Sequence, residues 1–431
     1  MDTKTESLYN KLKMLGKDVQ VLRNLGIVYT EGEDKVVVRL NKDTTIFRSA
    51  QIMLAGYGKE ITILKITGES NLQELFLTDI SDIEEIQLSL PNTHLTSGDS
   101  LFDNCKDLKR VKFLDFDTSK MISMFAMFSN CRKLTDPDIQ NIDTSSCTSF
   151  ESMFENCKIL GERGTIDLRN FNTSKVKSTI KMFMGCSRLR SIDVSTWDTS
   201  SLKSVSEMFF GCKSLFEADL SNWNMQCCSK LDWLFSECTG LRTVDITGWK
   251  TPMVFSLKGM FSNCNLLREI KGLNEISIDG VIRISNLFSN CEYLRDIDIS
   301  NWKTKSGSGL YTTHLFYNCS SVRKIDMRNL TIESNSMGIL NSCYELEELH
   351  VYSIRIVDRS AFTVQLFNDT MKLKTIVLYD TSLNEYERKR LKEDIRELLR
   401  TNIYDTNGLR LPDSTRVSMP SILFIDECIE K

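Results

Sequence analysis

Met182-Phe-Met-Gly-Cys186-Ser-Arg-Leu-Arg-Ser-Ile-Asp-Val-Ser-Thr-Trp-Asp-Thr-Ser200 is a unit that returns along this chain with small changes. Each copy places two large apolar residues four and three positions before an anchor residue, and another apolar residue three positions after it. Ten copies are anchored by a cysteine, at Cys105, Cys131, Cys157, Cys186, Cys212, Cys238, Cys264, Cys291, Cys319 and Cys343. An eleventh copy has Thr370 as its anchor. The spacing of 24 to 29 residues between cysteines predicts a solenoid of stacked repeats.

The repeat around Cys212 predicts one short helix and one strand. Val205, Met208, Phe209 and Cys212 follow the i, i+3, i+4, i+7 spacing of a helix. From Leu215 the pattern becomes L-x-x-φ-x-φ, where φ is apolar, which is the strand signature of leucine-rich repeats. The sequence therefore predicts an α/β fold. We expect a leucine-rich-repeat solenoid that forms a right-handed curved coil, with a parallel sheet on the concave face, short helices on the convex face, and a cap at each end.

The repeat array is expected to fill the middle of the chain. We predict an N-terminal cap helix with degenerate repeats over residues 1–98, about eleven repeats over residues 99–380, and a C-terminal cap helix and tail over residues 381–431. In the first region, residues 1–26 read as a helix, and residues 61–66 and 83–88 read as strands. In the last region, residues 384–399 read as an amphipathic helix. The apolar run 421–425 reads as a strand on the last coil, or as part of a partner-binding tail.

The cysteines are interpreted as buried ladder residues rather than as a metal or redox site. Cysteine is small and often buried, which suits a position packed between coils. A zinc site would need paired ligands or nearby histidines, and the chain has only three histidines. No metal and no cofactor are therefore predicted. Four cysteines lie off the ladder, and the adjacent Cys227 and Cys228 leave exposure of one thiol open.

Composition limits the partners and the compartment. The formal net charge is −4 over 431 residues, which gives no support to nucleic-acid or anionic-membrane binding. The polar N-terminus has no signal-peptide core, and no stretch is long and apolar enough to span a membrane. We therefore expect a cytoplasmic protein, with a host cell or a virion as open alternatives. The sequence leaves the oligomeric state open.

Two charged columns are predicted on the outward side of the strands. One column is acidic and contains Asp138, Asp167, Asp193, Asp219, Asp245, Asp298 and Asp326. The other lies four residues after the anchor and contains Lys109, Arg190, Arg242, Arg268, Arg295, Arg323 and Lys374. The columns either pair with each other or dock a charged partner. The candidate partner-binding residues are Arg190, Asp193, Asp219, Arg242, Asp245, Arg268, Arg295, Asp298, Arg323 and Asp326.

Four tryptophans recur eleven residues after their cysteines, namely Trp197, Trp223, Trp249 and Trp302. They are expected either to cover the ends of the core or to form a solvent-facing aromatic rim. An exposed rim would suit stacking against a peptide or a glycan.

The quoted unit resembles the BspA-like leucine-rich repeats, and most of all the branch described as a mycoplasma surface-lipoprotein domain of unknown function. That branch reads roughly M-F-x-x-C-x-x-L-x-x-L-D-L-S-x-W-D-T-S, and similar strings return at residues 208–223, 234–249 and 287–302. The resemblance covers roughly residues 100–380. It implies a binding role, because members of the family are mostly adhesins, bacterial lipoproteins and proteins of parasitic protists.

No enzyme is predicted. Residues 56–59, Gly-Tyr-Gly-Lys, lack the first glycine and the Ser/Thr of a P-loop, and the chain has no G-x-S-x-G, H-E-x-x-H or C-x-x-C. The main breaks in the repeat, including residues 271–280, bring no recognisable catalytic set. The sequence therefore predicts a non-catalytic protein–protein interaction scaffold, such as an inhibitor or effector, that binds a macromolecular partner on its concave face. The alternative is a phage or virion structural part, or an adhesin-like receptor-binding component.

Overall fold

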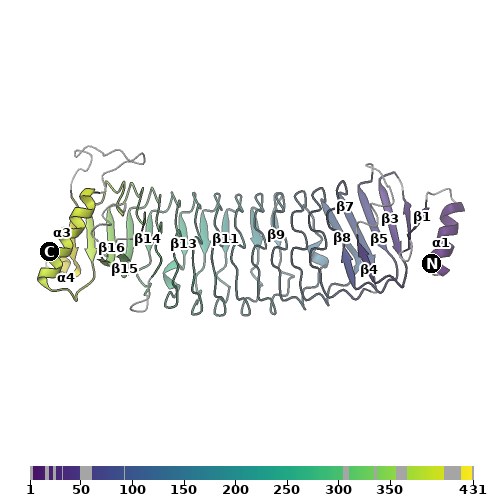
Figure 1. Ribbon diagram of the computed structural model, residues 1–431, viewed down its shortest axis with the longest axis horizontal. Helices are drawn as coiled ribbons and strands as arrows, with labels where there is room; N and C mark the ends of the chain where they lie inside the picture. The colour runs from purple at the N-terminus through teal and green to yellow at the C-terminus, as the bar shows by residue number, and fades with distance from the viewer. Residues whose placement is uncertain are drawn as a thin grey trace. The chain divides into compact units, whose positions relative to one another are not determined.

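The computed structural model describes residues 3–14, 19–22, 26–31, 33–48, 61–91, 93–303, 310–333, 337–355, 366–401 and 419–429. The chain divides into two compact units, Met1–Leu202 and Lys203–Lys431. Within each unit the chain winds in coils that stack on one another as a β-solenoid (Figure 1). The boundaries expected at residues 98 and 380 stay predictions.

The first unit begins with helix α1 (Thr3–Met14), whose Leu12 packs against Ile27. Three strands then pair antiparallel in the order β1 (Val19–Leu22), β2 (Gly26–Thr30) and β3 (Lys35–Leu40). The same sheet continues in parallel through β5 (Ile63–Thr67), β7 (Glu85–Leu90) and β8 (Arg110–Phe116). Shorter elements are β4 (Ile46–Arg48), β6 (Glu74–Phe76), η1 (Ile139–Asn141), β9 (Thr165–Asp167) and β10 (Ser191–Asp193).

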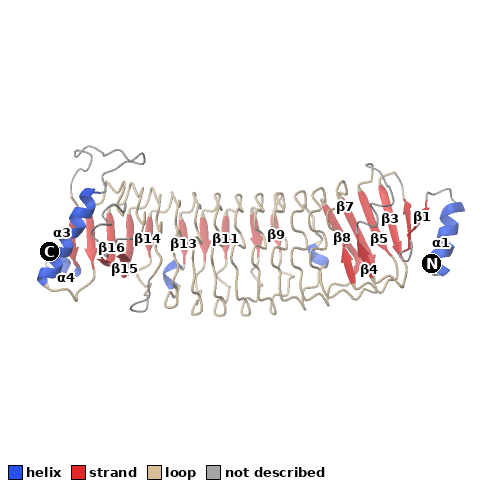
Figure 2. Ribbon diagram, viewed as in Figure 1, coloured by secondary structure: helices blue, strands red, loops and turns tan. Residues whose placement is uncertain are grey.

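The second unit carries two parallel sheets (Figure 2). The first consists of β11 (Glu217–Asp219), β12 (Thr243–Asp245) and β13 (Glu269–Lys271). The second consists of β14 (Asp296–Asp298), β15 (Lys324–Glu333), β16 (Glu348–Arg355), β17 (Thr375–Leu378) and β18 (Ser421–Phe424). The helical elements are η2 (Leu273–Glu275), α3 (Glu385–Thr401) and α4 (Ile425–Ile429).

The prediction of a short helix between the strands is wrong for the repeats that the structure describes. Residues 205–212 form turns instead. The amide N–H groups of Glu207 and Phe209 donate to carbonyls of the next coil at 2.9 and 3.0 Å, while Met208 and Cys212 close i to i+3 turns within their own coil. Glu207, the third residue of the turn that Met208 closes, has a φ of 58°, which is the left-handed conformation that some turns require at this position. Every second amide is thus paired with a neighbouring coil, so no helix is needed to satisfy the backbone.

The core of each unit is a stack of phenylalanines. In the second unit, Phe209, Phe235, Phe261, Phe288 and Phe316 lie ring on ring, with centroids 5.4–6.0 Å apart. Phe102, Phe128, Phe154 and Phe183 form the same stack in the first unit, at 5.1–5.5 Å. Offset stacking of this kind stabilises beyond the burial of area alone.

The ladder cysteines are buried free thiols, as the sequence predicts. At nine ladder positions the thiol also donates a hydrogen bond to a carbonyl of the preceding coil, which the small size and apolar character of cysteine do not explain. These positions are Cys105, Cys131, Cys157, Cys186, Cys238, Cys264, Cys291, Cys319 and Cys343. The Sγ of Cys264 donates to the Phe235 carbonyl at 3.0 Å, and the Sγ of Cys291 donates to that of Phe261 at 3.1 Å. Burial raises the pKa of these thiols, to about 12 for Cys343. The cysteine is therefore a polar link between coils as well as a filler.

The N-terminal prediction is wrong in part. Helix α1 ends at Met14 rather than near residue 26, and Gly26 already pairs with Leu40 in the sheet. A Cβ at Gly26, whose φ is 146°, would lie 1.9 Å from the Arg39 carbonyl oxygen, so only glycine fits this strand start. The strands expected at residues 61–66 and 83–88 are confirmed by β5 and β7.

The helix and the strand expected near the C-terminus are confirmed by α3 and β18, and the role of this region as a cap stays a prediction. Helix α3 buries Ile395, Leu398 and Leu399. Strand β18 adds to β17 in parallel, as expected for residues 421–425. The rest of the tail, residues 402–418, 430 and 431, lies outside the described residues, as do Gly56 to Lys59.

Candidate partner-binding site

The outward side of the strands in the second unit, which we call the strand face, carries four arginines on neighbouring coils. They are exposed, and each precedes a strand or its equivalent by one position. Backbone hydrogen bonds hold them as two pairs: the Arg268 amide donates to the Arg242 carbonyl at 2.9 Å, and the Arg323 amide donates to that of Arg295 at 2.6 Å. We call Arg242, Arg268, Arg295 and Arg323 the arginine column.

In the first unit the corresponding cations are Lys109 and Arg190. The Nζ of Lys109 lies 2.7 Å from the Glu84 carboxylate, so that charge is paired. Arg190 is exposed. In the second unit, Lys374 pairs with Glu347 at 2.6 Å.

The predicted acidic residues do line up across the strands. The register pairs Asp167 with Asp193, Asp219 with Asp245, and Asp298 with Asp326. Asp138 lies outside these strands, in the left-handed residue before η1, and its Oδ2 accepts the Phe113 amide at 2.6 Å.

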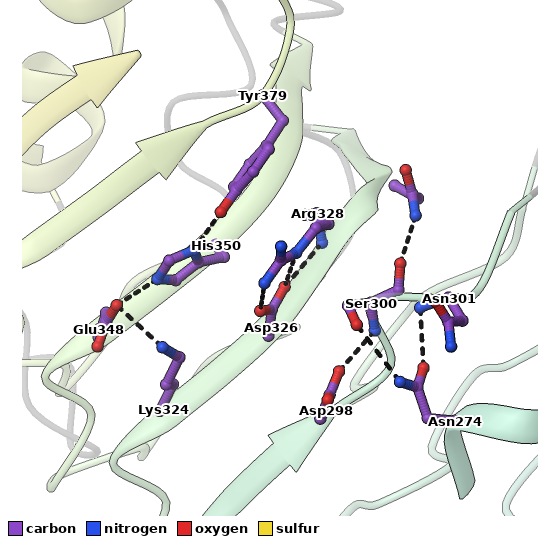
Figure 3. Close-up of polar contacts among 11 residues, drawn as sticks. Asn274, Asp298, Ser300, Asn301, Lys324, Asp326, Arg328, Glu348, His350 and Tyr379 are labelled. Carbon is purple, nitrogen blue, oxygen red and sulfur yellow. Dashed lines mark hydrogen bonds and ion pairs between the residues drawn. The ribbon is translucent and has the colours of Figure 1, made fainter. Parts of the chain in front are cut away.

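Several of these aspartates close the turn that ends their strand, a role that the sequence interpretation missed. Asp219 accepts the amide of Ser221 at 3.0 Å and its hydroxyl at 2.7 Å. Asp298 accepts the amide of Ser300 at 2.9 Å (Figure 3). At Asp193, hydrogen bonds from the side chain and amide of Ser195 lower the pKa of the carboxyl. The signal was present in the sequence as the recurring Asp-φ-Ser/Thr spacing, which is typical of an Asx turn.

In the described part of the chain, the two predicted columns do not pair with each other. Among the described residues, no ion pair joins the arginine column to the aspartates that the sequence placed opposite it. Instead, the Arg242 guanidinium lies 4.8 Å from the Phe216 ring centroid, and that of Arg268 lies 5.8 Å from the Tyr293 centroid. The Asp245 carboxylate lies 4.0 Å from Lys271. In the part of the chain that the structure describes, the arginine column and the acidic residues are therefore not mutual ion pairs.

Asp326 belongs to a satisfied polar network and is a poor candidate for partner binding. It is 5% exposed and accepts from both the Arg328 guanidinium and the Arg328 amide (Figure 3). Burial alone would raise the pKa of Asp326, and the hydrogen bonds and charge of Arg328 lower it instead.

The next coil extends this network. His350 contacts the Glu348 carboxylate through Nε2 and the Tyr379 hydroxyl through Nδ1, the latter at 2.8 Å (Figure 3). Lys324 lies 3.1 Å from the same carboxylate. Lys324 and Glu348 are therefore already paired with each other on this part of the strand face.

A hollow of about 300 Å³ opens on the strand face where the repeat breaks. At this point η2 replaces the usual Asp-φ-Ser turn, and no strand pairing joins β13 to β14 among the described residues. This break falls within residues 271–280, which stand out in the sequence. The charged side chains that line the hollow are those of Arg268, Glu269, Glu275, Asp296 and Asp298.

The prediction of a solvent-facing aromatic rim is wrong. Trp197, Trp223, Trp249 and Trp302 are 0–4% exposed, so their ring faces are not open to a ligand. The indole N–H of Trp249 donates to the Leu220 carbonyl at 2.8 Å, and that of Trp302 to the Leu273 carbonyl at 3.0 Å. The tryptophans cover the core and link neighbouring coils, which was the other expectation.

The described residues contain neither a cluster of metal ligands nor a membrane-spanning helix. No group of three or more His, Cys, Asp or Glu side chains there is placed to hold a metal ion. No described helix is both long enough and apolar enough to cross a membrane.

Stacked coils, L-x-x-φ-x-φ strands and buried Phe and Cys ladders define a β-solenoid of the leucine-rich-repeat type. The chain belongs to the family described as Mycoplasma protein of unknown function, DUF285. The family model matches residues 70–163, 162–270 and 229–346, together more than half of the chain. No curated protein matches the sequence.

Several solved structures are similar to this chain at low identity. A leucine-rich cell surface protein from Faecalibacterium prausnitzii is 14% identical, with a TM-score of 0.31, and the match covers 80% of this chain and 97% of that one. A chain of the Toll–Spatzle complex from Drosophila is 14% identical, with a TM-score of 0.31, over 82% of this chain and 51% of that one. An internalin from Listeria monocytogenes is 14% identical, with a TM-score of 0.26, over 79% and 86%. Matches at this level say nothing of what the chain binds.

Proposed function

We propose that this protein is a non-catalytic interaction scaffold that binds a protein partner through the strand face of its second unit. The observation that carries the proposal is the arginine column: four exposed arginines on neighbouring coils, held as two hydrogen-bonded pairs and without an ion pair among the described residues. We further propose that this face is the concave side of the coil and that the protein acts in the cytoplasm. We also propose that the repeats are BspA-like, because the M-F-x-x-C-x-x-L strings resemble that class of repeat.

An unpaired column of this kind is costly to an isolated protein. Neighbouring strands lie about 4.8 Å apart, and like charges placed directly opposite each other across strands are destabilising. A partner that supplies carboxylates to the column removes this repulsion. Arginine is enriched among the residues that dominate binding energy at protein interfaces.

Part of the column is already held in place. The rings of Phe216 and Tyr293 support the guanidinium groups of Arg242 and Arg268. Ordering a long side chain on binding costs roughly 0.5–1.5 kcal/mol, and support from an aromatic ring reduces that cost. The column therefore suits binding better than four freely rotating lysines would.

The acidic residues support binding rather than catalysis. Asp219 and Asp298 are engaged in turns, and Asp326 is buried against Arg328. A general acid or base needs access to a substrate. A scaffold that blocks or recruits its partner, as an inhibitor or effector does, needs only the exposed charges.

The proposal is tested with the double variant Arg242→Glu and Arg295→Glu. The matched control is Lys203→Glu and Arg283→Glu, which makes the same charge change at exposed residues off the strand face. Partners cross-linked to the native protein in its source are identified and then titrated against purified variants. We expect the arginine variant to bind about a hundredfold more weakly, at about 1.4 kcal/mol per tenfold, and the control to bind normally. Equal binding by both variants would refute the proposal, and co-purification with particles would favour a virion component.

A further inference from the structure

We propose that the segment of the partner that docks on the strand face is an α-helix that lies along the arginine column and across the strands. Its acidic residues form a stripe toward the arginines, with basic residues on one side of the stripe and apolar residues on the other. The inference rests on the proposed function, because it assigns the occupant of the same surface. Its basis is the kind and the spacing of the side chains on both sides of the arginine column.

One side of the arginine column carries carboxylates at the first position of three strands. Glu217, Glu269 and Asp296 begin β11, β13 and β14, and all three are exposed. We call them the acidic column, and none of them forms an ion pair among the residues that the structure describes. A partner that is acidic throughout would attract the arginines and be repelled by the acidic column, and juxtaposed like charges exclude such partners. The acidic part of the partner is therefore a narrow stripe with positive charge beside it.

The other side of the arginine column carries apolar side chains. Leu266 and Tyr293 precede Arg268 and Arg295 by two residues, and so stand before the arginine where the acidic column stands after it. Tyr293 is 48% exposed and Leu266 is half-buried. Phe216, which takes the place of an arginine one coil before Arg242, is 47% exposed. Exposed apolar side chains that gather beside a charged strip are typical of a contact surface.

The backbone of the strand face favours a helix over an extended peptide. The strands here pair with one another within their two sheets, so the face presents side chains. At the step between β13 and β14 the Phe261 and Phe288 centroids are 6.0 Å apart, whereas an inserted strand needs about 9.6 Å, twice the strand spacing. An extended peptide thus lacks the main-chain hydrogen bonds that strand addition supplies. A helix satisfies its own backbone and binds through side chains alone.

The spacing of the arginines also suits a helix. The column consists of two hydrogen-bonded pairs, separated by the step at which β13 and β14 do not pair. Paired coils lie about 4.8 Å apart. Helix residues i, i+3, i+7 and i+10 rise by about 4.5, 6 and 4.5 Å, so the longest rise is also in the middle and the stripe spans about 15 Å. Four alternate residues of an extended peptide span about 20 Å, which overshoots the column.

The hollow lies beside this middle step and gives the helix a direction. Its volume is about 300 Å³, and its charged lining includes the carboxylates of Glu269 and Asp296 from the acidic column. A lysine on the basic side of the helix reaches these carboxylates, and charge-assisted hydrogen bonds of this kind are strong. Of the two directions along the column, only one places the basic side of a given helix on the acidic column. The surface therefore selects the order of the stripes as well as their spacing.

Synthetic peptides titrated against the full chain test this geometry. The striped peptide has about 18 residues, with glutamates at i, i+3, i+7 and i+10, lysines on one side of them and leucines on the other, an arrangement that also stabilises the free helix. The scattered peptide has the same composition, with its glutamates distributed around the helix. The broken peptide is the striped one with a proline near its centre, which interrupts the helix. Binding is measured by fluorescence anisotropy at low salt.

We expect the native chain to bind the striped peptide at least about tenfold more tightly than the scattered or the broken peptide. A variant with the whole column reversed should lose this preference: Arg242→Glu, Arg268→Glu, Arg295→Glu and Arg323→Glu. The same variant should bind a striped peptide whose glutamates are replaced by lysines, and that recovery shows that the variant folds. The matched control reverses four exposed cations off the strand face and should bind the striped peptide normally: Lys203→Glu, Lys230→Glu, Lys250→Glu and Arg283→Glu.

Two outcomes overturn the inference: equal binding of the striped and scattered peptides by the native chain, or a broken peptide that binds as tightly as the striped one. A natural partner that depends on the arginine column, in a chain that shows no preference for the striped peptide, would overturn this inference and leave the proposed function standing. The proposed function itself fails on a separate result, in which Arg242→Glu with Arg295→Glu and its own control bind the natural partner equally.

Discussion

At the scale of single residues, the ladder thiols combine packing with a hydrogen bond. Cys264 is fully buried, and its Sγ donates to the Phe235 carbonyl at 3.0 Å. Cys264→Ala removes that donor and leaves a small cavity. We expect the free energy of unfolding to fall by about 1–2 kcal/mol, measured by urea denaturation. The control is Cys227→Ala at an exposed position, where a change within about 0.5 kcal/mol is expected. Equal losses at the two sites would contradict the ladder role.

The same residues predict a sharp difference in chemical reactivity. Cys227 is exposed and its neighbour Cys228 is buried, with burial raising the pKa of the Cys228 thiol to about 12. The thiolate is the reactive form. Brief treatment of the native protein with iodoacetamide should therefore alkylate Cys227 at least about tenfold faster than Cys228, as measured by peptide mass spectrometry. In urea the two rates should converge, and comparable rates in the native state would contradict the burial of Cys228.

At the scale of the secondary-structure element, the apolar spacing predicted the buried residues better than the backbone conformation. Val205, Met208 and Phe209 are buried as expected. The spacing i, i+3, i+4, i+7 also suits two successive turns. It does not indicate which carbonyl groups accept hydrogen bonds from the backbone amides. The acceptor can be identified only when the coils are stacked, because the Phe209 amide donates to a carbonyl of the next repeat. The repeat period, by contrast, could be predicted because it is written in the sequence.

The same limit applies to the candidate site. The sequence could place Asp219 on the outward side because residues alternate along a strand, and Arg242 there because it is an x position of the L-x-x-φ-x-φ pattern. It could not assign the Asp219 carboxylate to its own turn, although Ser221 two residues later was the available signal. The burial of the Trp249 indole could not be decided from one repeat either. Its N–H donates to the Leu220 carbonyl, which belongs to the preceding repeat.

Strand β7 gives a pH-dependent prediction. Burial alone would raise the pKa of Glu85, but hydrogen bonds from Lys112, Gln87 and Arg110 lower it from 4.5 to about 2. Because the folded pKa lies below the unfolded one, the stabilisation is present above about pH 4.5 and is lost as the pH falls toward 2. Glu85→Gln should therefore cost about 2 kcal/mol at pH 7 and little near pH 2.

The measurement is urea denaturation of both proteins across that pH range, with Glu84→Gln as the neighbouring control. Glu84 is more exposed, with 41% of its side chain accessible, and it pairs with Lys109. Exposed pairs contribute about 0–1 kcal/mol. A Glu85→Gln effect that is the same at pH 7 and pH 2 would rule out the charge as its cause.

At the scale of the whole molecule, a solenoid is stable only where its coils cover one another, so its last coil needs a cap. In the second unit we expect that cap to be α3 together with β18 and α4 (Figure 1). Arg388 lies 2.7 Å from the Asp426 carboxylate, and Lys392 lies 2.8 Å from Glu427. The Arg388 guanidinium also lies 4.6 Å from the Phe424 ring centroid. These contacts fasten the helix to the strand that completes the sheet.

The apolar side of α3 should therefore protect the whole second unit, and not only its own helix. The double variant Ile395→Ser and Leu398→Ser removes two fully buried side chains and exposes apolar surface at the end of the stack. We expect at least about 4 kcal/mol of destabilisation, with binding of a hydrophobic dye and concentration-dependent aggregation. Glu393→Ser with Arg396→Ser, at exposed positions of the same helix, is the matched control. If the first variant kept native stability, the cap would be dispensable, and stacking between the phenylalanines alone would have to hold the final coils together.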